Sequence, residues 1–226
     1  MIYITHFSLP PSCGGKEKHR MEHEAGLSLL KEGLLREFGL EMPDISAAVK
    51  AGERGKPYLF QYPDIHFNIS HSGNVAVCAV GRRALGVDVE LVRPVKLPSF
   101  RRVLTQGEQQ RLERCSGEER DREFFRIWTL KESYAKALGV GLGLDFTSVE
   151  FQLWPEGENF WQARAKQMGG TEERESGEEA SANEGWRLVQ TFHNFGEEEY
   201  VISFCGEENI EGNHVIETDG FREYIS

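Results

Sequence analysis

The sequence has few cysteines, and they lie far apart. Cys13, Cys78, Cys115 and Cys205 are its four cysteines, and none of them forms a C-x-x-C pair. This spacing argues against a structural zinc site and against a disulfide framework. Reduced thiols in a cytoplasmic protein fit the pattern best.

Long apolar runs and an excess of positive charge are also missing. No run of about 18 apolar residues occurs, and the opening MIYITHFSLPP lacks a basic segment followed by an apolar one. We therefore expect neither a membrane span nor a secretion signal. The chain has 26 Lys and Arg residues against 37 Asp and Glu residues, and its formal net charge of −11 argues against a nucleic-acid partner, which would need a broad basic face.

The first part of the chain has the patterns of a strand, a helix and a hairpin. β-branched and aromatic residues predict a strand over 2–7, and apolar residues at helical spacing predict a helix over 20–38. Two β-rich runs, NVAVCAV and LGVDVELV, are joined by the short GRRA, so we expect them to form a hairpin. Residues 1–100 are predicted to be an N-terminal subdomain that contains this hairpin.

Residues 101–226 are predicted to be a C-terminal subdomain. Thr105 and Glu108 form a capping box that opens one helix, and residues 124–139 have the apolar spacing of another. Four alternating runs, SVEFQLW, FWQARAK, WRLVQTF and YVISFCG, predict an antiparallel sheet. Residues 169–185 are acidic and nearly without large apolar residues, which predicts a flexible loop. Together these patterns predict an α+β protein of two units around mainly antiparallel sheets.

The helix predicted at 124–139 carries charges among residues that should pack against a core. In WTLKESYAKALG, Glu132 and Lys136 lie one turn apart at the margin of the apolar arc, while Lys131 falls inside the arc. A Glu-to-Lys pair four residues apart would explain two of these charges, and Lys131 could extend its ammonium to water. A functional site is the alternative, and the helix alone does not decide between them.

Two carboxylates in LGVDVELV favour the functional site. In a strand, Asp88 and Glu90 point to the same side. Such alternation is usual where one face of a strand is solvated. Two like charges this close repel each other, however, and a bound cation offsets the repulsion. With Glu132 they would form an oxygen-rich site of the kind that Mg²⁺ prefers, usually together with a substrate phosphate.

The segment GKPYLFQYPDIHFNISHSGN supplies Lys56, Ser70 and His71. Ser70 and His71 are adjacent, so their side chains diverge in an extended segment, which disfavours a serine hydrolase. A single histidine is commonly structural, and Lys56 between glycine and proline has the setting of a turn lysine. Taken together, the three residues would form a phosphate-binding rim.

Four segments in this order, GKPYL, FNISHSG, GVDVE and WTLKESYAKALG, resemble the Sfp-like branch of the 4′-phosphopantetheinyl transferase superfamily. The resemblance implies a monomer of two similar α/β halves related by a pseudo-twofold axis, with the active site in the cleft between them. It also implies Mg²⁺-dependent transfer of the 4′-phosphopantetheine arm of coenzyme A (CoA) to a serine of an apo acyl or peptidyl carrier protein. The other product would be 3′,5′-ADP.

The resemblance assigns roles to individual residues. Asp88, Glu90 and Glu132 match the metal-binding acids of the family. Glu132 and Lys136 are the catalytic candidates, with Glu132 or a metal-bound water as the base and Lys136 beside the departing phosphate. The residues matched to CoA contacts are Lys56, Ser70, His71, Lys131 and Lys136, with His71 placed at the 3′-phosphate.

Two functions of other classes stay open. A non-catalytic module that binds CoA or a carrier protein would keep the fold, although binding alone does not need the complete set of acids. A Mg²⁺-dependent phosphoester hydrolase would use the same carboxylates with water as the nucleophile. The carrier is open as well, because a net charge of −11 repels an acidic carrier unless local arginines such as Arg82, Arg83, Arg101 and Arg102 face it.

Overall fold

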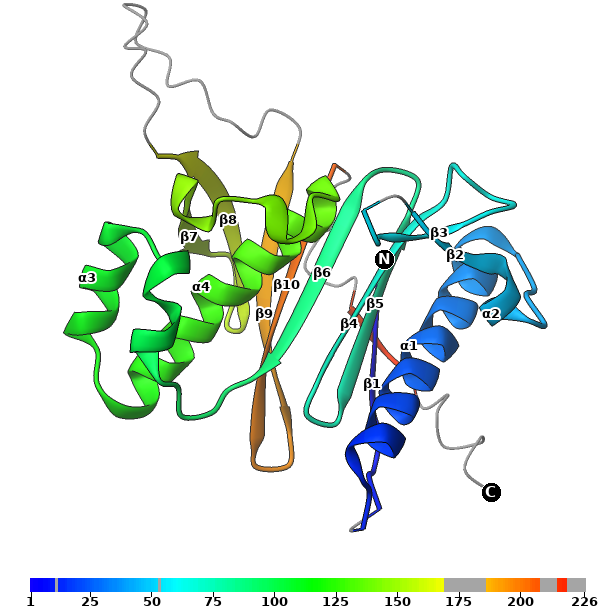
Figure 1. The fold of residues 1–226 in the computed structure, drawn as a ribbon, viewed down its shortest axis with the longest axis horizontal. Helices are drawn as coiled ribbons and strands as arrows, with labels where there is room; N and C mark the ends of the chain where they lie inside the picture. Colours follow the sequence, from blue (N-terminus) through cyan, green and yellow to red (C-terminus); the bar gives the residue numbers. More distant parts are fainter. Residues whose placement is uncertain (11, 53, 169–185, 208–214, 219–226) are drawn as a thin grey trace, which may run out of the picture.

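Two sheets form the framework of the computed structural model, which describes residues 1–10, 12–52, 54–168, 186–207 and 215–218 (Figure 1). The first sheet has the strand order β11-β1-β5-β4, and its members are β1 (Ile2–His6), β4 (His66–Ser72), β5 (Val75–Gly81) and β11 (Val215–Glu217). The second has the order β6-β10-β9-β8-β7, and its members are β6 (Leu85–Leu91), β7 (Val149–Pro155), β8 (Phe160–Gln167), β9 (Arg187–Phe195) and β10 (Glu198–Gly206). A small sheet pairs β2 (Val49–Ala51) with β3 (Pro57–Leu59). All these pairs are antiparallel except β1 with β11, so the predicted α+β class with mainly antiparallel sheets is confirmed.

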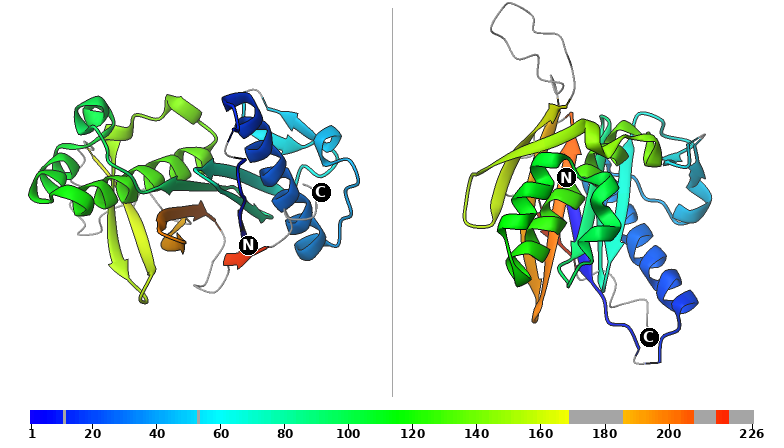
Figure 2. Two further views of the ribbon diagram at one scale, coloured as in Figure 1. Left: turned by 90° about the horizontal axis from the view of Figure 1, so that it is seen from below. Right: turned by 60° about the vertical axis from the view of Figure 1, so that its left-hand side comes forward.

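Each large sheet has one long helix beside it (Figures 1 and 2). The helix α1 (Gly15–Phe38) packs Leu30 and Leu34 against the first sheet, and α4 (Gly117–Leu138) packs Leu130 and Tyr134 against the second. Both helices end at a glycine with φ of 66°, a left-handed conformation that glycine adopts without strain. The shorter helices are α2 (Ile45–Ala48), α3 (Gln106–Arg114) and the 3-10 turns η1 (Leu97–Val103), η2 (Gly141–Gly143) and η3 (Phe146–Ser148). None of the described helices has the length and apolar character needed to span a membrane.

Most predicted elements are present. The predicted strand near the start is β1, the predicted helices lie within α1 and α4, and the four alternating runs are β7 to β10, paired in sequence order. The capping box of α3 is formed on both sides, because Glu108 N donates to Thr105 Oγ1 and Thr105 N donates to the Glu108 carboxylate. The loop predicted at 169–185 lies outside the described residues.

The predicted hairpin of NVAVCAV with LGVDVELV is wrong. These runs are β5 and β6, and β5 instead pairs with β4 and β1, while β6 pairs with β10 in the other sheet. The two strands meet through side chains, since Val77 of β5 and Val87 of β6 share one apolar core between the sheets. The short link GRRA therefore connects strands of two different sheets. Both strands bury an apolar face in the shared core without backbone hydrogen bonds between them.

The predicted boundary near residue 100 stays a prediction. The sheets do not follow it strictly, since β6 comes from the first 100 residues but lies in the second sheet, and β11 comes from the end of the chain but lies in the first. The two parts of the chain therefore exchange one strand each.

One ion pair is fully enclosed where α3, α4 and the start of β7 meet. Lys131 Nζ lies 2.9 Å from Glu108 Oε2, and neither side chain has any exposed surface. Lys131 also donates to the carbonyl oxygens of Phe146 and Val149. Burial lowers the pKa of Lys131 and raises the pKa of Glu108, so each charge is held against a desolvation penalty by the other.

We expect Glu108→Ala to reduce the free energy of unfolding by about 3–5 kcal/mol, because it leaves a buried ammonium without its counterion. Urea denaturation at neutral pH measures this loss. The matched control is Glu24→Ala, which breaks the exposed pair with Arg20 and should cost about 0–1 kcal/mol. The double variant Glu108→Leu with Lys131→Met should recover most of the stability, and a loss below about 1 kcal/mol for Glu108→Ala would contradict the role of the pair.

Candidate active site

The two large sheets are joined edge to edge by side chains of β4. The strand β4 is the edge of the first sheet and β6 is the edge of the second. Polar side chains at alternate positions of β4 accept hydrogen bonds from backbone N–H groups of β6. The three hydrogen bonds of this β4–β6 seam run from Val87 N to Asn68 Oδ1 (2.8 Å), from Val89 N to Ser70 Oγ (3.4 Å) and from Leu91 N to Ser72 Oγ (3.2 Å). Side chains thus replace the carbonyls that a neighbouring strand would supply.

The serines of the seam also orient the two acids predicted on β6. Ser70 Oγ donates to Asp88 Oδ1 at 2.8 Å, and Ser72 Oγ donates to Glu90 Oε2 at 2.8 Å. Asp88 and Glu90 therefore share the side of β6 that faces the β4 serines, as the alternation predicted. Glu90 is also 3.3 Å from Arg93, an exposed pair of small energetic weight.

Gly86 brings α4 directly onto β6. A Cβ atom at this position would collide with the carbonyl oxygen of Ser133 and with the backbone nitrogen of Ala137. The absence of a side chain therefore lets the last turns of α4 lie against the strand. As a result, Glu132 and Lys136 reach the neighbourhood of Asp88.

Lys136 pairs with Asp88 and not with Glu132, which corrects the helix pair considered from the sequence. Lys136 Nζ lies 2.6 Å from Asp88 Oδ1, and it also donates to Ser70 Oγ at 3.1 Å and to the Val87 carbonyl oxygen at 3.3 Å. Asp88 is 5% exposed, whereas the Lys136 side chain is 27% exposed. The lysine therefore neutralises a buried acid and still has one side open to solvent.

Asp88, Glu90 and Glu132 form an acid cluster around this single ammonium. Burial raises the pKa of Asp88, and the Lys136 charge opposes this effect. Burial also raises the pKa of Glu132, and the charges of Asp88 and Glu90 add to the rise. Excess negative charge is therefore confined at the seam, where a cation would be favourable.

The acid cluster fits a hard divalent cation. Asp88 Oδ2 is buried and has no hydrogen-bond partner among the residues that the structure describes. The three acids are not among the compact donor groups of the described residues, in which all ligand atoms lie within 4.8 Å of one another. A Mg²⁺ ion at this cluster would therefore use few carboxylates and keep several water ligands, as it usually does.

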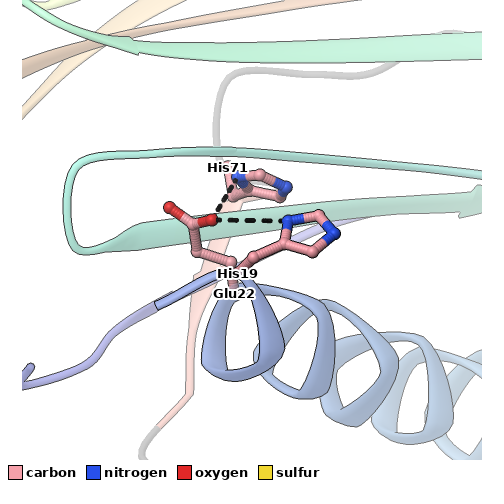
Figure 3. A group of neighbouring side chains, drawn as sticks. All are labelled: His19, Glu22 and His71. Carbon is pink, nitrogen blue, oxygen red and sulfur yellow. Dashed lines mark ion pairs between the residues drawn. The ribbon is translucent and has the colours of Figure 1, made fainter. Parts of the chain in front are cut away.

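His71 and Ser70 diverge, as predicted for neighbours in a strand. Ser70 contacts Asp88 on β6, whereas His71 Nδ1 lies 3.5 Å from Glu22 Oε2 on α1 (Figure 3). Burial lowers the pKa of His71, and the charge of Glu22 opposes this effect. A nucleophile-base pair between Ser70 and His71 is thus excluded by geometry.

Lys56 lies at the C-terminal end of α4. Its Nζ donates to the carbonyl oxygens of Lys136 (2.7 Å), Leu85 (2.9 Å) and Ala137 (3.4 Å). Two of these carbonyls lie in the last turn of α4 and the third begins β6, and a cation is favourable at the C-terminal end of a helix. Lys56 also lines a surface pocket of about 360 Å³, with Pro57, Tyr58 and Leu138 among its walls.

Lys131 does not belong to this site, and the CoA contact predicted for it is wrong. Its side chain has no exposed surface, and its ammonium is paired with Glu108. The alternative that Lys131 extends to water is wrong for the same reason. A lysine with this environment stabilises the packing of α4 and cannot reach a solvent-borne substrate.

Sequence reasoning missed several residues that build the site. Asn68 and Ser72 were not singled out, although the alternation N-x-S-x-S in β4 is a visible signal for one polar face. Gly86 also carried a signal, because a glycine inside a strand indicates a close approach. No sequence pattern indicated Glu22, since its contact with His71 joins residues distant in the sequence.

Comparison with known proteins adds an independent observation. The family model described as the 4′-phosphopantetheinyl transferase superfamily matches residues 84–205. A 4′-phosphopantetheinyl transferase from Bacillus subtilis is 35% identical over 132 residues, which are 58% of this chain and 58% of that protein. The 4′-phosphopantetheinyl transferase HetI from Nostoc sp. strain PCC 7120 is 35% identical over 144 residues, 61% of this chain and 60% of that protein. The solved holo-[acyl-carrier-protein] synthase of Thermotoga maritima has a TM-score of 0.37 and 21% identity, covering 57% of this chain and 66% of that chain.

The alignments span about three fifths of the curated relatives. The family match includes β6, α4 and β10, and therefore all three members of the acid cluster and Lys136. Because this match covers more than half of the residues, the chain belongs to the 4′-phosphopantetheinyl transferase superfamily.

Proposed function

We propose that this protein transfers the 4′-phosphopantetheine arm of CoA to a serine of an apo acyl or peptidyl carrier protein, releasing 3′,5′-ADP. The observation that carries the proposal is the acid cluster around Lys136, at the seam of the two sheets and inside the segment that matches the family. We also propose that the enzyme acts as a cytoplasmic monomer.

Asp88, Glu90 and Glu132 would hold the Mg²⁺ ion. The buried Asp88 Oδ2 has no partner among the described residues, and burial together with the neighbouring carboxylates raises the pKa of Asp88 and of Glu132. When bound, Mg²⁺ would neutralise charge on the pyrophosphate of CoA.

Glu132 is the proposed base for the carrier serine. With a cation bound beside it, the Glu132 carboxylate would be ionised at neutral pH, as a base requires. It is half-buried on α4, beside Asp88 and Lys136, so a proton accepted there stays close to the acid cluster.

Lys136 and His71 are the proposed groups for CoA phosphates. The Lys136 ammonium is held in place by Asp88 and Ser70, and its open side can contact a phosphate without moving the helix. A fixed ammonium stabilises the charge that develops on the leaving phosphate. His71 lies on the other face of β4, where we assign it to the 3′-phosphate. Lys56 and Ser70 stay predicted CoA contacts, and in addition Ser70 holds Asp88 and Lys136 while Lys56 supports the end of α4.

The acidic carrier would approach through exposed arginines. Arg101 and Arg102 lie together on η1 and are exposed, whereas Arg82 stacks over Phe38 and Arg83 is 3.8 Å from Glu207. The pair on η1 is therefore the better candidate for attracting a negative partner to a chain with a net charge of −11.

Incubation of the protein with CoA, Mg²⁺ and a panel of apo carrier proteins tests the function directly. We expect a carrier to gain the mass of one phosphopantetheine arm and 3′,5′-ADP to accumulate, and both signals to vanish with EDTA or with Asp88→Ala. Mass spectrometry reads both products, and Glu113→Ala, at an exposed acid of α3, is the matched control. Free phosphopantetheine without carrier modification would favour a hydrolase, and CoA binding without any product would favour a binding module.

Glu132→Gln should stabilise the metal-free protein at neutral pH. The pKa of Glu132 in the folded state is raised above the ordinary 4.5. Between the unfolded and the folded pKa, the folded state therefore binds more protons than the unfolded state, and the free energy of unfolding falls as the pH rises through this range. The substitution removes this loss, so its advantage should shrink as the pH is lowered toward about 4.5.

Urea midpoints in EDTA as a function of pH measure the effect of Glu132→Gln. Glu113→Gln is the control at an exposed site. Added Mg²⁺ should raise the midpoint of the unsubstituted protein more than that of Glu132→Gln. A Glu132→Gln protein that is less stable than the unsubstituted protein at neutral pH in EDTA would disprove the electrostatic account.

Lys136→Met should lower kcat about 10²–10³-fold, the usual loss when a fixed donor to transition-state charge is removed. Because Lys136 is the counterion of a buried acid, the same variant should also lose about 1–3 kcal/mol of stability without metal. Steady-state kinetics at a temperature where the variant stays folded separates the two effects. Lys136→Arg should recover only part of the rate, and Lys50→Met, at an exposed lysine, should change neither quantity. A kcat within a few-fold of the unsubstituted value would remove Lys136 from the mechanism.

A further inference from the structure

A second group of possible metal ligands lies on the far side of β4 from Asp88. His19 and Glu22 are three residues apart near the start of α1, so they share a face of that helix. His71 reaches them from the end of β4, as Figure 3 shows. One ligand atom from each of the three residues lies within 4.8 Å of the other two.

The Glu22 carboxylate lies between the two imidazoles. Its Oε2 atom is 3.5 Å from His71 Nδ1 and 3.9 Å from His19 Nδ1. The rings of His19 and His71 meet edge to face at 6.3 Å between centroids. Glu22 is 8% exposed, so its carboxylate is held in place, whereas the side chain of His19 is 77% exposed and can turn toward it.

We propose that His19, Glu22 and His71 bind a transition-metal cation of the Zn²⁺ class. Two imidazoles and one carboxylate are a ligand set that Zn²⁺ accepts, with a further position left for water or an anion. Bonds of about 2.0–2.2 Å place the ligand atoms of a tetrahedral site roughly 3.5 Å apart, close to the 3.5 Å and 3.9 Å from Glu22 Oε2 to the two Nδ1 atoms. A small rotation of the exposed His19 ring completes the geometry.

This site is separate from the acid cluster in position and in chemistry. Imidazole ligands favour Zn²⁺ and its neighbours over Mg²⁺, which takes oxygen ligands. The competing charge is Lys18, whose Nζ lies 3.6 Å from Glu22 Oε1. Its side chain is 42% exposed, so it can move into solvent when a cation binds.

The site has a consequence that rests on the proposed function. His71 is assigned there to the 3′-phosphate of CoA, so a cation on the same histidine adds positive charge beside that phosphate. Zinc should therefore tighten the binding of 3′,5′-ADP more than that of AMP, which lacks the 3′-phosphate.

Titration of the full chain with Zn²⁺ against a chromophoric chelator tests the site itself. We expect one tight site, which His19→Ala and His71→Ala each weaken by at least about 10–100-fold, the loss typical for residues that only support a ligand. His23→Ala is the matched control, because His23 is exposed on the same helix and is not a member of the group. Cys13→Ser and Glu132→Ala should also leave zinc affinity unchanged, which separates the site from thiols and from the acid cluster.

The variants keep this test decisive. His19 is exposed, so its replacement does not threaten the fold, and equal zinc affinity of His19→Ala and the unsubstituted protein would overturn the proposal. If zinc binding depends on His19 and His71 but affects 3′,5′-ADP and AMP equally, the metal site stands and the CoA contact of His71 fails.

Discussion

The β4–β6 seam is the contact on which the candidate site depends. The hydroxyl groups of Ser70 and Ser72 each make two hydrogen bonds to β6. Each oxygen accepts from a backbone N–H group of β6, and each O–H donates to an acid of β6. One atom thereby joins the two sheets and orients a carboxylate. The packing of the sheets and the geometry of the acid cluster cannot be altered independently, because they share these atoms.

Much of the architecture could be predicted because it is periodic in the sequence. The strands β7 to β10 follow one another and pair in order, and α1 and α4 have apolar faces at helical spacing. The placement of β6 could not be predicted in this way, since alternation shows that a strand has an apolar face but not which strand will pair with it. The same limit applies to His19, Glu22 and His71, which only the packing of α1 on β4 brings together.

The three charges of α4 show how tertiary contacts divide one motif among different tasks. Lys131 and Lys136 are five residues apart, which places them about 140° apart around a helix. They cannot serve one site, and the structure directs Lys131 to Glu108 in the core and Lys136 to Asp88 at the seam. The helical wheel places Lys131 inside the apolar arc, but only the fold shows that Glu108 lies there as its partner.

The choice of Asp88 over Glu132 as the partner of Lys136 follows from burial. An ionised acid costs most where water is excluded, and Asp88, with 5% of its surface exposed, is the more buried of the two. The ammonium therefore stabilises more by pairing with Asp88, and Glu132 keeps its charge beside two other carboxylates. Stability alone would favour replacing such an acid by a neutral residue. The position of Glu132, close to a fixed lysine and to the buried Asp88, instead agrees with the proposed site for a divalent cation and a phosphate.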